Sequence, residues 1–140
     1  MEPNYPDVIP MIAYEDGPEA MDWLAEAFGF RERARMVGAD GRLGHGEMEA
    51  GEGLIMLATP TPDYRGPKNH RESCDQARTW SSVPYIIDGV LVYVKDARAH
   101  YDRARKAGAT ILSELEEGSD GTRYRAEDLE GHRWMFIQRG

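Results

Sequence analysis

The sequence contains a single cysteine, Cys74, among its 140 residues. An intrachain disulfide is therefore impossible, and no paired-cysteine motif for zinc, haem or redox chemistry can form. Long apolar runs are missing too, so we expect no membrane-spanning segment. The first residues lack the basic and apolar regions of a signal peptide. Together these absences favour a cytoplasmic globular protein.

Positive charge is also scarce. Lys and Arg number 17 against 25 Asp and Glu, which gives a formal net charge of −8. Such a balance repels phosphate backbones and anionic lipids, so we predict neither a nucleic-acid partner nor a membrane partner. Hydrophobic residues make up 41% of the chain and charged residues 30%. This composition is typical of a folded domain, which at this length can bury a core without disulfides or metal.

The second half of the chain repeats the plan of the first half about 80 residues later. Residues 16–24 align with 96–104, and residues 53–57 align with 132–136. In each half a strand is followed by a capped helix and then by further strands. The repeat predicts two βαβββ modules. We therefore expect an α+β fold in which both modules form a curved mixed sheet with a cleft.

A long connection separates the two modules of this single domain, which cover about residues 6–58 and 88–139. Its own span, about 59–87, is rich in proline, and a short helix is predicted from Arg71 to Trp80. Connections of this length are often binding loops. Basic and aromatic side chains gather in it: Arg65, Lys68, His70, Arg71, Trp80 and Tyr85. Two alternatives follow, a lid over an anionic or aromatic ligand or an arm at a dimer interface.

Residues 96–111 and 125–136 resemble the vicinal-oxygen-chelate superfamily. The acidic-x-acidic-Gly turn from Asp128 to Gly131, placed before a strand that ends in an aromatic residue, is typical of its last hairpin. The superfamily includes glyoxalase I, extradiol dioxygenases, fosfomycin-resistance enzymes and bleomycin-binding resistance proteins. Within it the chain looks most similar to the PhnB-like group. The resemblance implies the paired βαβββ fold, a small-molecule ligand and a homodimer.

The usual metal site of that superfamily is predicted to be missing. Its metalloenzymes take His, Glu or Gln ligands from the first and last strand of each module, and the resemblance puts Ile9, Met56, Gly89 and Met135 at those positions. None of these side chains offers a nitrogen or carboxylate ligand, and thioether sulfur is a soft donor. We therefore expect no metal and no other cofactor. This departure argues against glyoxalase I and extradiol dioxygenase activity.

Strand periodicity suggests which side chains line the cleft. Alternation puts the methionines of the first and last strands on one face, and it puts Ile55, Leu57, Trp134 and Phe136 on the opposite face beneath the helices. A cleft lined by methionine adapts to varied apolar ligands, although such methionines are equally typical of a core. The candidate ligand-binding residues are Met11, Met56, Tyr93, Tyr124, Arg133, Met135 and Trp80.

His45, Glu47 and Glu49 alternate along one predicted strand and so project from one face. The carboxylate of Glu47 beside the His45 imidazole is the best candidate for acid–base catalysis, or for two ligands of a displaced metal. A solvated strand face explains the same pattern. In the repeat alignment His45 corresponds to Tyr124, so both are expected on equivalent cleft walls.

His100, His132 and Cys74 are predicted to have structural roles and no catalytic role. His100 is expected on the surface of the second helix, and hydrogen bonding in the last turn accounts for His132. Cys74 has no activating partner nearby in the sequence. A thiol without such a partner is not predicted to be a nucleophile.

Two functions of different classes remain open. The first is a metal-independent binding protein of the glyoxalase/bleomycin-resistance type that holds an apolar or aromatic ligand in the cleft, for resistance or sequestration. The second is a lyase, isomerase or dioxygenase-like enzyme that uses His45 and Glu47, with or without a non-standard divalent metal. The missing metal ligands favour the first, and the His/Glu pair keeps the second open. A weaker third hypothesis is that the long connection docks a partner.

Overall fold

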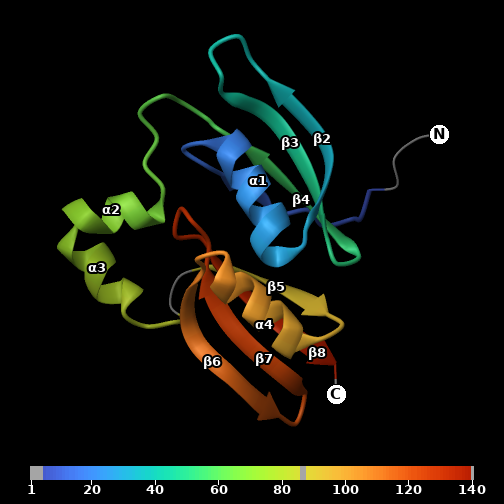
Figure 1. The fold of residues 1–140 in the computed structure, drawn as a ribbon. Coiled ribbons are helices and arrows are strands. Elements are labelled where there is room, and N and C mark those ends of the chain that lie inside the picture. Colours follow the sequence, from blue (N-terminus) through green and yellow to red (C-terminus); the bar gives the residue numbers. More distant parts are fainter. Residues whose placement is uncertain (1–4, 86–87, 140) are drawn as a thin grey trace.

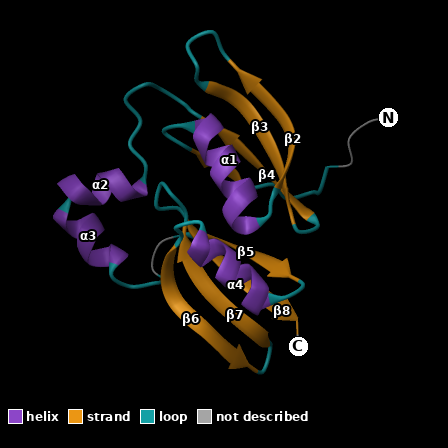
Figure 2. Cartoon of the chain, viewed as in Figure 1, coloured by secondary structure: helices purple, strands orange, loops and turns teal. Residues whose placement is uncertain are grey.

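The computed structural model describes residues 5–85 and 88–139 and shows two βαβββ modules in sequence (Figures 1 and 2). The first module contains β1 (Met11–Ala13), α1 (Gly17–Phe28), β2 (Arg31–Val37), β3 (Leu43–Ala50) and β4 (Gly53–Ala58). The second contains β5 (Gly89–Val94), α4 (Ala97–Lys106), β6 (Thr110–Gly118), β7 (Gly121–Glu127) and β8 (Arg133–Arg139). Each module forms a mixed four-stranded sheet, in the orders β1-β4-β3-β2 and β5-β8-β7-β6. The predicted α+β class and the repeat are confirmed.

Local sequence explains how the two equivalent helices begin. The side chain of Asp16 accepts a hydrogen bond from the Glu19 amide at 3.1 Å, and that of Asp96 accepts one from the Ala99 amide at 3.0 Å. Each contact satisfies a backbone donor that the first turn of a helix leaves unpaired. Gly29 ends α1 in the left-handed conformation, with φ 73°, where a residue without a side chain is favoured.

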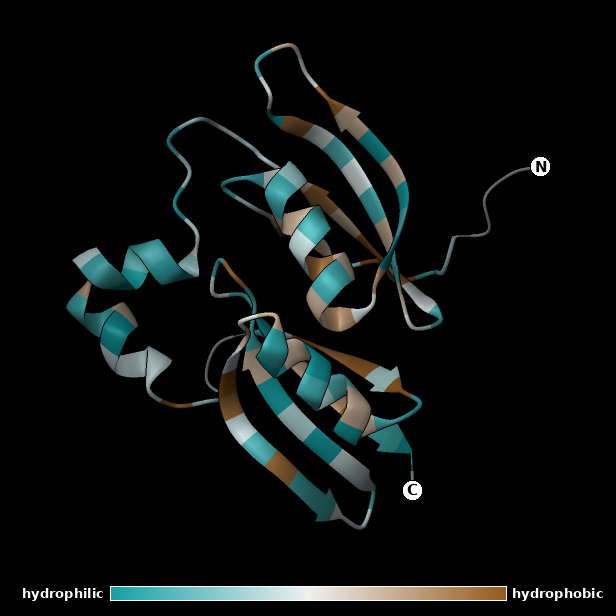
Figure 3. Ribbon diagram, in the orientation of Figure 1, coloured by the Kyte–Doolittle hydropathy of each residue, from teal (hydrophilic) through white to brown (hydrophobic). Residues whose placement is uncertain are grey.

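The connection between the modules folds into two short helices instead of the single one predicted. These are α2 (Pro67–Ser73) and α3 (Asp75–Ser81), and the extended backbone of Cys74, with φ −135° and ψ 112°, interrupts them. Neither helix buries a residue, and hydrophilic residues dominate both (Figure 3). Residues 66–85, called the arm below, therefore need polar contacts to hold them beside the modules.

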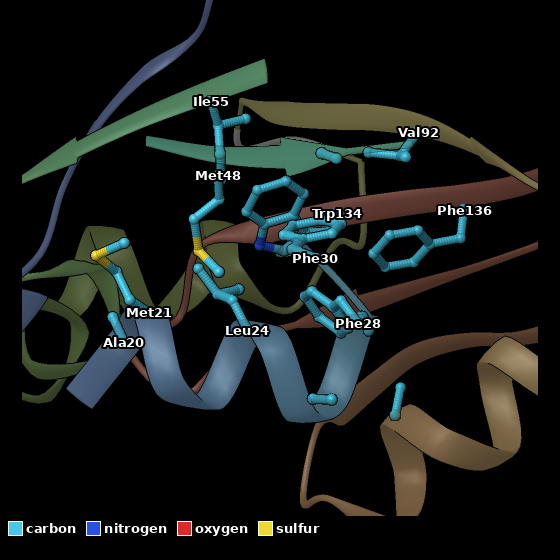
Figure 4. Close-up of a cluster of buried hydrophobic side chains, with 14 of the residues drawn as sticks. Ala20, Met21, Leu24, Phe28, Phe30, Met48, Ile55, Val92, Trp134 and Phe136 are labelled. Carbon is cyan, nitrogen blue, oxygen red and sulfur yellow. The ribbon is translucent and has the colours of Figure 1, made fainter. Parts of the chain in front are cut away.

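The two modules share one hydrophobic core. Side chains of α1, of the first sheet and of the second sheet meet in it, as Figure 4 shows for Leu24, Met48, Ile55, Trp134 and Phe136. Helices α1 and α4 also lie against each other (Figure 1). The predicted face is confirmed because Ile55, Trp134 and Phe136, together with Leu57, are at most 1% exposed. The opposite face of each sheet, which we call its outer face, points away from this core.

His100 joins the modules and does not lie on the surface. Its Nδ1 is 2.5 Å from the Tyr124 hydroxyl, and its Nε2 is 2.9 Å from the Phe28 carbonyl oxygen at the end of α1. The surface prediction is wrong because the first module covers this side of α4. Burial lowers the pKa of His100 to about 4, and the positive charge of Arg103 adds to the effect.

No described helix combines the length and the apolar composition required to cross a bilayer.

Candidate functional site

The outer face of the first sheet combines methionines with a polar pair. Met11 on β1 pairs with Met56 on β4, which in turn pairs with Glu47 on β3. Residues paired across a ladder share a face, so all three lie on the outer face, with His45 two residues from Glu47 on the same side. Met11 is 82% exposed, which shows how open this face is in a single chain.

Glu47 is the centre of a small hydrogen-bonding cluster. His45 Nε2 lies 2.7 Å from Glu47 Oε2, and the hydroxyl of Tyr5 donates to the same carboxylate at 3.0 Å. The hydrogen bond from His45, supported by that from Tyr5, lowers the pKa of Glu47. An ionised carboxylate in this position accepts a hydrogen bond from the imidazole and orients it. The predicted contact between His45 and Glu47 is therefore formed, while its catalytic role stays a prediction.

The residues present do not fit a metal site of the expected kind. Across residues 5–85 and 88–139, nowhere do three His, Cys, Asp or Glu side chains gather in a way that could hold a metal ion. On the first outer face, the best candidates for ligands of a displaced metal are His45 and Glu47, and these two side chains bond to each other. At the expected positions, Met56 and Met135 lie on the two outer faces and Gly89 has no side chain. We therefore derive no chemistry through a metal.

Arg133, a candidate ligand-binding residue, is tied into a buried ionic network. Its guanidinium donates to Glu127 at 3.0 and 2.8 Å, to the Val83 carbonyl at 2.7 Å and to the Ser81 carbonyl at 2.6 Å. Arg133 and Glu127 are only 4% and 2% exposed. Arg133 thus connects the second sheet to the end of the arm.

The start of the arm is held in the same polar manner. Arg71 forms a bidentate pair with Glu127 at 2.7 and 3.0 Å. The carboxylate of Glu15, which follows β1, accepts from the Gly66 amide at 2.7 Å and from the Asn69 side chain at 2.8 Å. Charge-assisted bonds of this kind are stronger than neutral ones, and they position an arm that contributes no buried apolar residue.

The acidic turn before β8 links the second module to the first. Asp128 accepts from the Tyr14 hydroxyl at 2.5 Å and from the Trp134 indole at 3.1 Å. Burial raises the pKa of Asp128. Glu130 accepts from the backbone amide of Asp16 at 2.9 Å, and His132 Nε2 lies 2.7 Å from the Ala13 carbonyl. His132 is thus more than the turn residue predicted, because its side chain also bonds to β1.

Two adjoining hollows open beside Arg133. The first, which we call the arm hollow, has a volume of about 190 Å³ and lies between the arm and the second outer face, where Tyr85, Leu91, Arg125 and Met135 contribute to its wall. The second, of about 310 Å³, lies between β1 and the start of β5 and includes Met11. Both are lined by Gly89, Val90, Arg133 and Trp134. Concave sites with mostly apolar walls and a few polar groups are typical of small-molecule binding.

The candidate ligand-binding residues divide into groups. Met11, Arg133 and Met135 line the hollows. Met56 and Tyr93 also lie on the outer faces but line neither hollow; Met56 pairs with Met11, which does, and Tyr93 pairs with Ile137, which does not. Trp80 is 55% exposed at the end of α3 and lines neither hollow.

The placement of Tyr124 on a cleft wall is wrong. Its side chain is 0% exposed and belongs to the core behind the sheet. The ladder explains the error, because Glu47 pairs with Met56 as Arg125 pairs with Met135. Tyr124 therefore corresponds to Gly46 and not to His45. In this register His45 corresponds to Arg123 and Glu47 to Arg125, so the shift missed these two arginines of the outer face. Their signal was the alternation of β7 counted from β8.

Comparisons with known proteins agree with this fold. The sequence profile of the Glyoxalase/Bleomycin resistance protein/Dioxygenase superfamily matches residues 9–136. The chain is 31% identical over 138 residues to an uncharacterized protein of Mycobacterium bovis, with 95% of this chain and 83% of that protein covered. It is similar to the structure of TioX from Micromonospora sp. ML1, at 30% identity and a TM-score of 0.69, over 96% of this chain and 97% of that one. It also resembles the bleomycin-binding protein of Streptomyces verticillus in complex with copper(II)-bleomycin, at 14% identity and a TM-score of 0.57, over 99% and 100% of the two chains.

Proposed function

The chain belongs to the glyoxalase/bleomycin resistance protein/dioxygenase superfamily, and we propose that it is a metal-independent binding protein for an apolar or aromatic small molecule. The observation that carries this proposal is the pair of hollows beside Arg133, whose walls include Met11, Leu91 and Met135. The resemblance puts Ile9, Met56 and Met135, with Gly89, where the superfamily's metalloenzymes place hard ligands. The S. verticillus neighbour, which binds bleomycin, supports a role in sequestration or resistance.

Substitution of Met135 by Lys provides the test. In chelator-treated protein we expect saturable binding of a neutral aromatic probe, naphthalene-2-carboxamide, in calorimetric titration. Met135→Lys should weaken that binding about tenfold or more, because it places a charge in an apolar wall. Trp80→Lys, which changes an exposed aromatic residue outside both hollows, should leave the affinity unchanged. Binding that requires an added divalent metal, or equal effects of the two variants, would contradict the proposal.

We propose further that the protein works as a homodimer. In a single chain the outer faces expose Met11, Met36, Leu91 and Tyr93, the last three at 64%, 48% and 46%. Exposed apolar patches of this kind mark interaction sites. The partner that the superfamily resemblance implies for these exposed residues is a second copy of this chain.

The dimer is tested by its mass in solution. We expect sedimentation equilibrium to give twice the chain mass of 15.8 kDa, and we expect Met36→Lys to shift the population toward the monomer by at least tenfold in the dissociation constant. A native protein that stays monomeric at high micromolar concentration would exclude the dimer.

Two further predictions stay predictions. They are the membership of the PhnB-like group and a cytoplasmic location, which a lone cysteine favours.

The contact of 2.7 Å between His45 and Glu47 supports a second candidate, acid–base catalysis on the first outer face. A carboxylate that orients an imidazole is the arrangement that a general base requires. Such an enzyme would be a lyase, an isomerase or a dioxygenase-like catalyst. Undiminished turnover in a His45→Ala variant would rule out this role for the pair.

A further inference from the structure

Arg125 is a cationic side chain held in a largely apolar hollow. It lies on the outer face of β7, paired with Met135 on β8 and with Ser113 on β6. It is half-buried and lines the arm hollow. Its guanidinium forms no hydrogen bond or ion pair with any residue in the described part of the chain. It therefore keeps its donors available to a ligand.

The neighbouring charges on the same face are already paired. The carboxylate of Glu127 accepts from both Arg71 and Arg133. Arg123, two residues before Arg125, bonds to Glu116 at 2.8 Å. Among the described residues, the carboxylates of Glu127 and Glu116 on this face are therefore already paired, and Asp88 lines the adjoining hollow. The formal net charge of the chain, −8, therefore does not predict the charge inside the arm hollow.

The walls around Arg125 are suited to a flat apolar group. Leu91 and Tyr85 are 48% and 72% exposed, and with Met135 they present apolar surface to the arm hollow. A charge next to such walls is partly removed from water, so its attraction for an anion is stronger than at an open surface. The planar guanidinium matches the two oxygens of a carboxylate in a bidentate pair.

We propose that the arm hollow binds an aromatic carboxylate, with the ring against Leu91, Tyr85 and Met135 and the carboxylate on Arg125. This inference rests on the proposed binding function and specifies its ligand class. It also assigns a role to the arm. Arg133 bonds to the carbonyls of Ser81 and Val83, and this contact positions the segment just before Tyr85, which lines the hollow.

Two probes that differ only in charge test the inference. Chelator-treated native protein should bind naphthalene-2-carboxylate about tenfold more tightly than naphthalene-2-carboxamide in calorimetric titrations at pH 7. Arg125→Met should weaken binding of the carboxylate about tenfold, because a charge-assisted bond is lost, and should leave binding of the carboxamide unchanged. Arg123→Met is the matched control on the same strand and face, and it should change neither affinity.

The results that would contradict the role of Arg125 differ from those that would contradict the proposed binding function. Equal affinity of the native protein for the two probes, or equal effects of Arg125→Met and Arg123→Met, would overturn the assignment of Arg125 while leaving the binding of a neutral aromatic molecule in place. Absence of binding for both probes would overturn the proposed function and this inference together.

Discussion

Substitution of Arg133 by Met is expected to lower the free energy of unfolding by about 3 to 5 kcal/mol, the usual cost of removing one partner of a buried ion pair. The side chains of Arg133 and Glu127 are only 3% and 2% exposed, so Glu127 would keep a buried charge with Arg71 as its one remaining cationic partner. The carbonyls of Ser81 and Val83 would lose their donor as well. Urea unfolding monitored by circular dichroism measures the loss.

The same variant separates a structural role from a ligand-binding role. If Arg133 holds the arm, Arg133→Met should also increase proteolytic cleavage within residues 66–85, because the arm buries no apolar residue of α2 or α3. Arg123→Met removes an exposed pair, with side chains 34% and 60% exposed, and should leave the free energy of unfolding nearly unchanged. A residue that served only a ligand would leave unfolding and cleavage of the free protein unchanged, and that result would refute the structural role.

Alternation along the strands was enough to predict the two faces of each sheet. Because successive residues of a strand point to opposite sides, the placement of Trp134 and Phe136 in the core put Met135 on the outer face between them. The failure at Tyr124 has the same origin. A shift of one residue moves every side chain of a strand to the other face, and the repeat alignment of His45 with Tyr124 contained that shift. Strand pairing, and not residue similarity, supplies the missing register.

The role of Arg133 could not be predicted in this way. Its partners Ser81 and Val83 are about 50 residues distant in the sequence, and they offer backbone carbonyls that carry no sequence signal. The fold of the arm has the same character, since α2 and α3 show no apolar periodicity that would indicate where they dock. The contact between His45 and Glu47 was predictable because it is local, two residues apart on one strand. Contacts that depend on how the modules meet were not.

His100 shows what such a contact between modules does to stability, and its pH dependence is the second large effect we expect. In the folded protein burial holds the pKa of His100 near 4, whereas its ordinary value is 6.5. Between these two values the unfolded chain binds a proton that the folded chain does not, so stability falls as the pH falls. Each pH unit costs about 1.4 kcal/mol, which gives a loss of about 3 kcal/mol between pH 6.5 and pH 4.

A His100→Gln variant should lack this loss, because its amide can still donate to the Phe28 carbonyl but does not titrate. The quantity to measure is the difference in unfolding free energy between the native protein and the variant across this pH range. Burial raises the pKa values of Asp128 and Glu130, which stabilises the fold as the pH falls, but those groups are present in both proteins and cancel in the difference. His70→Gln, at an exposed position on α2, should behave like the native protein. A difference that stays constant from pH 7 to pH 4 would show that His100 is not held neutral, and the junction between α4 and α1 would then tolerate a charge.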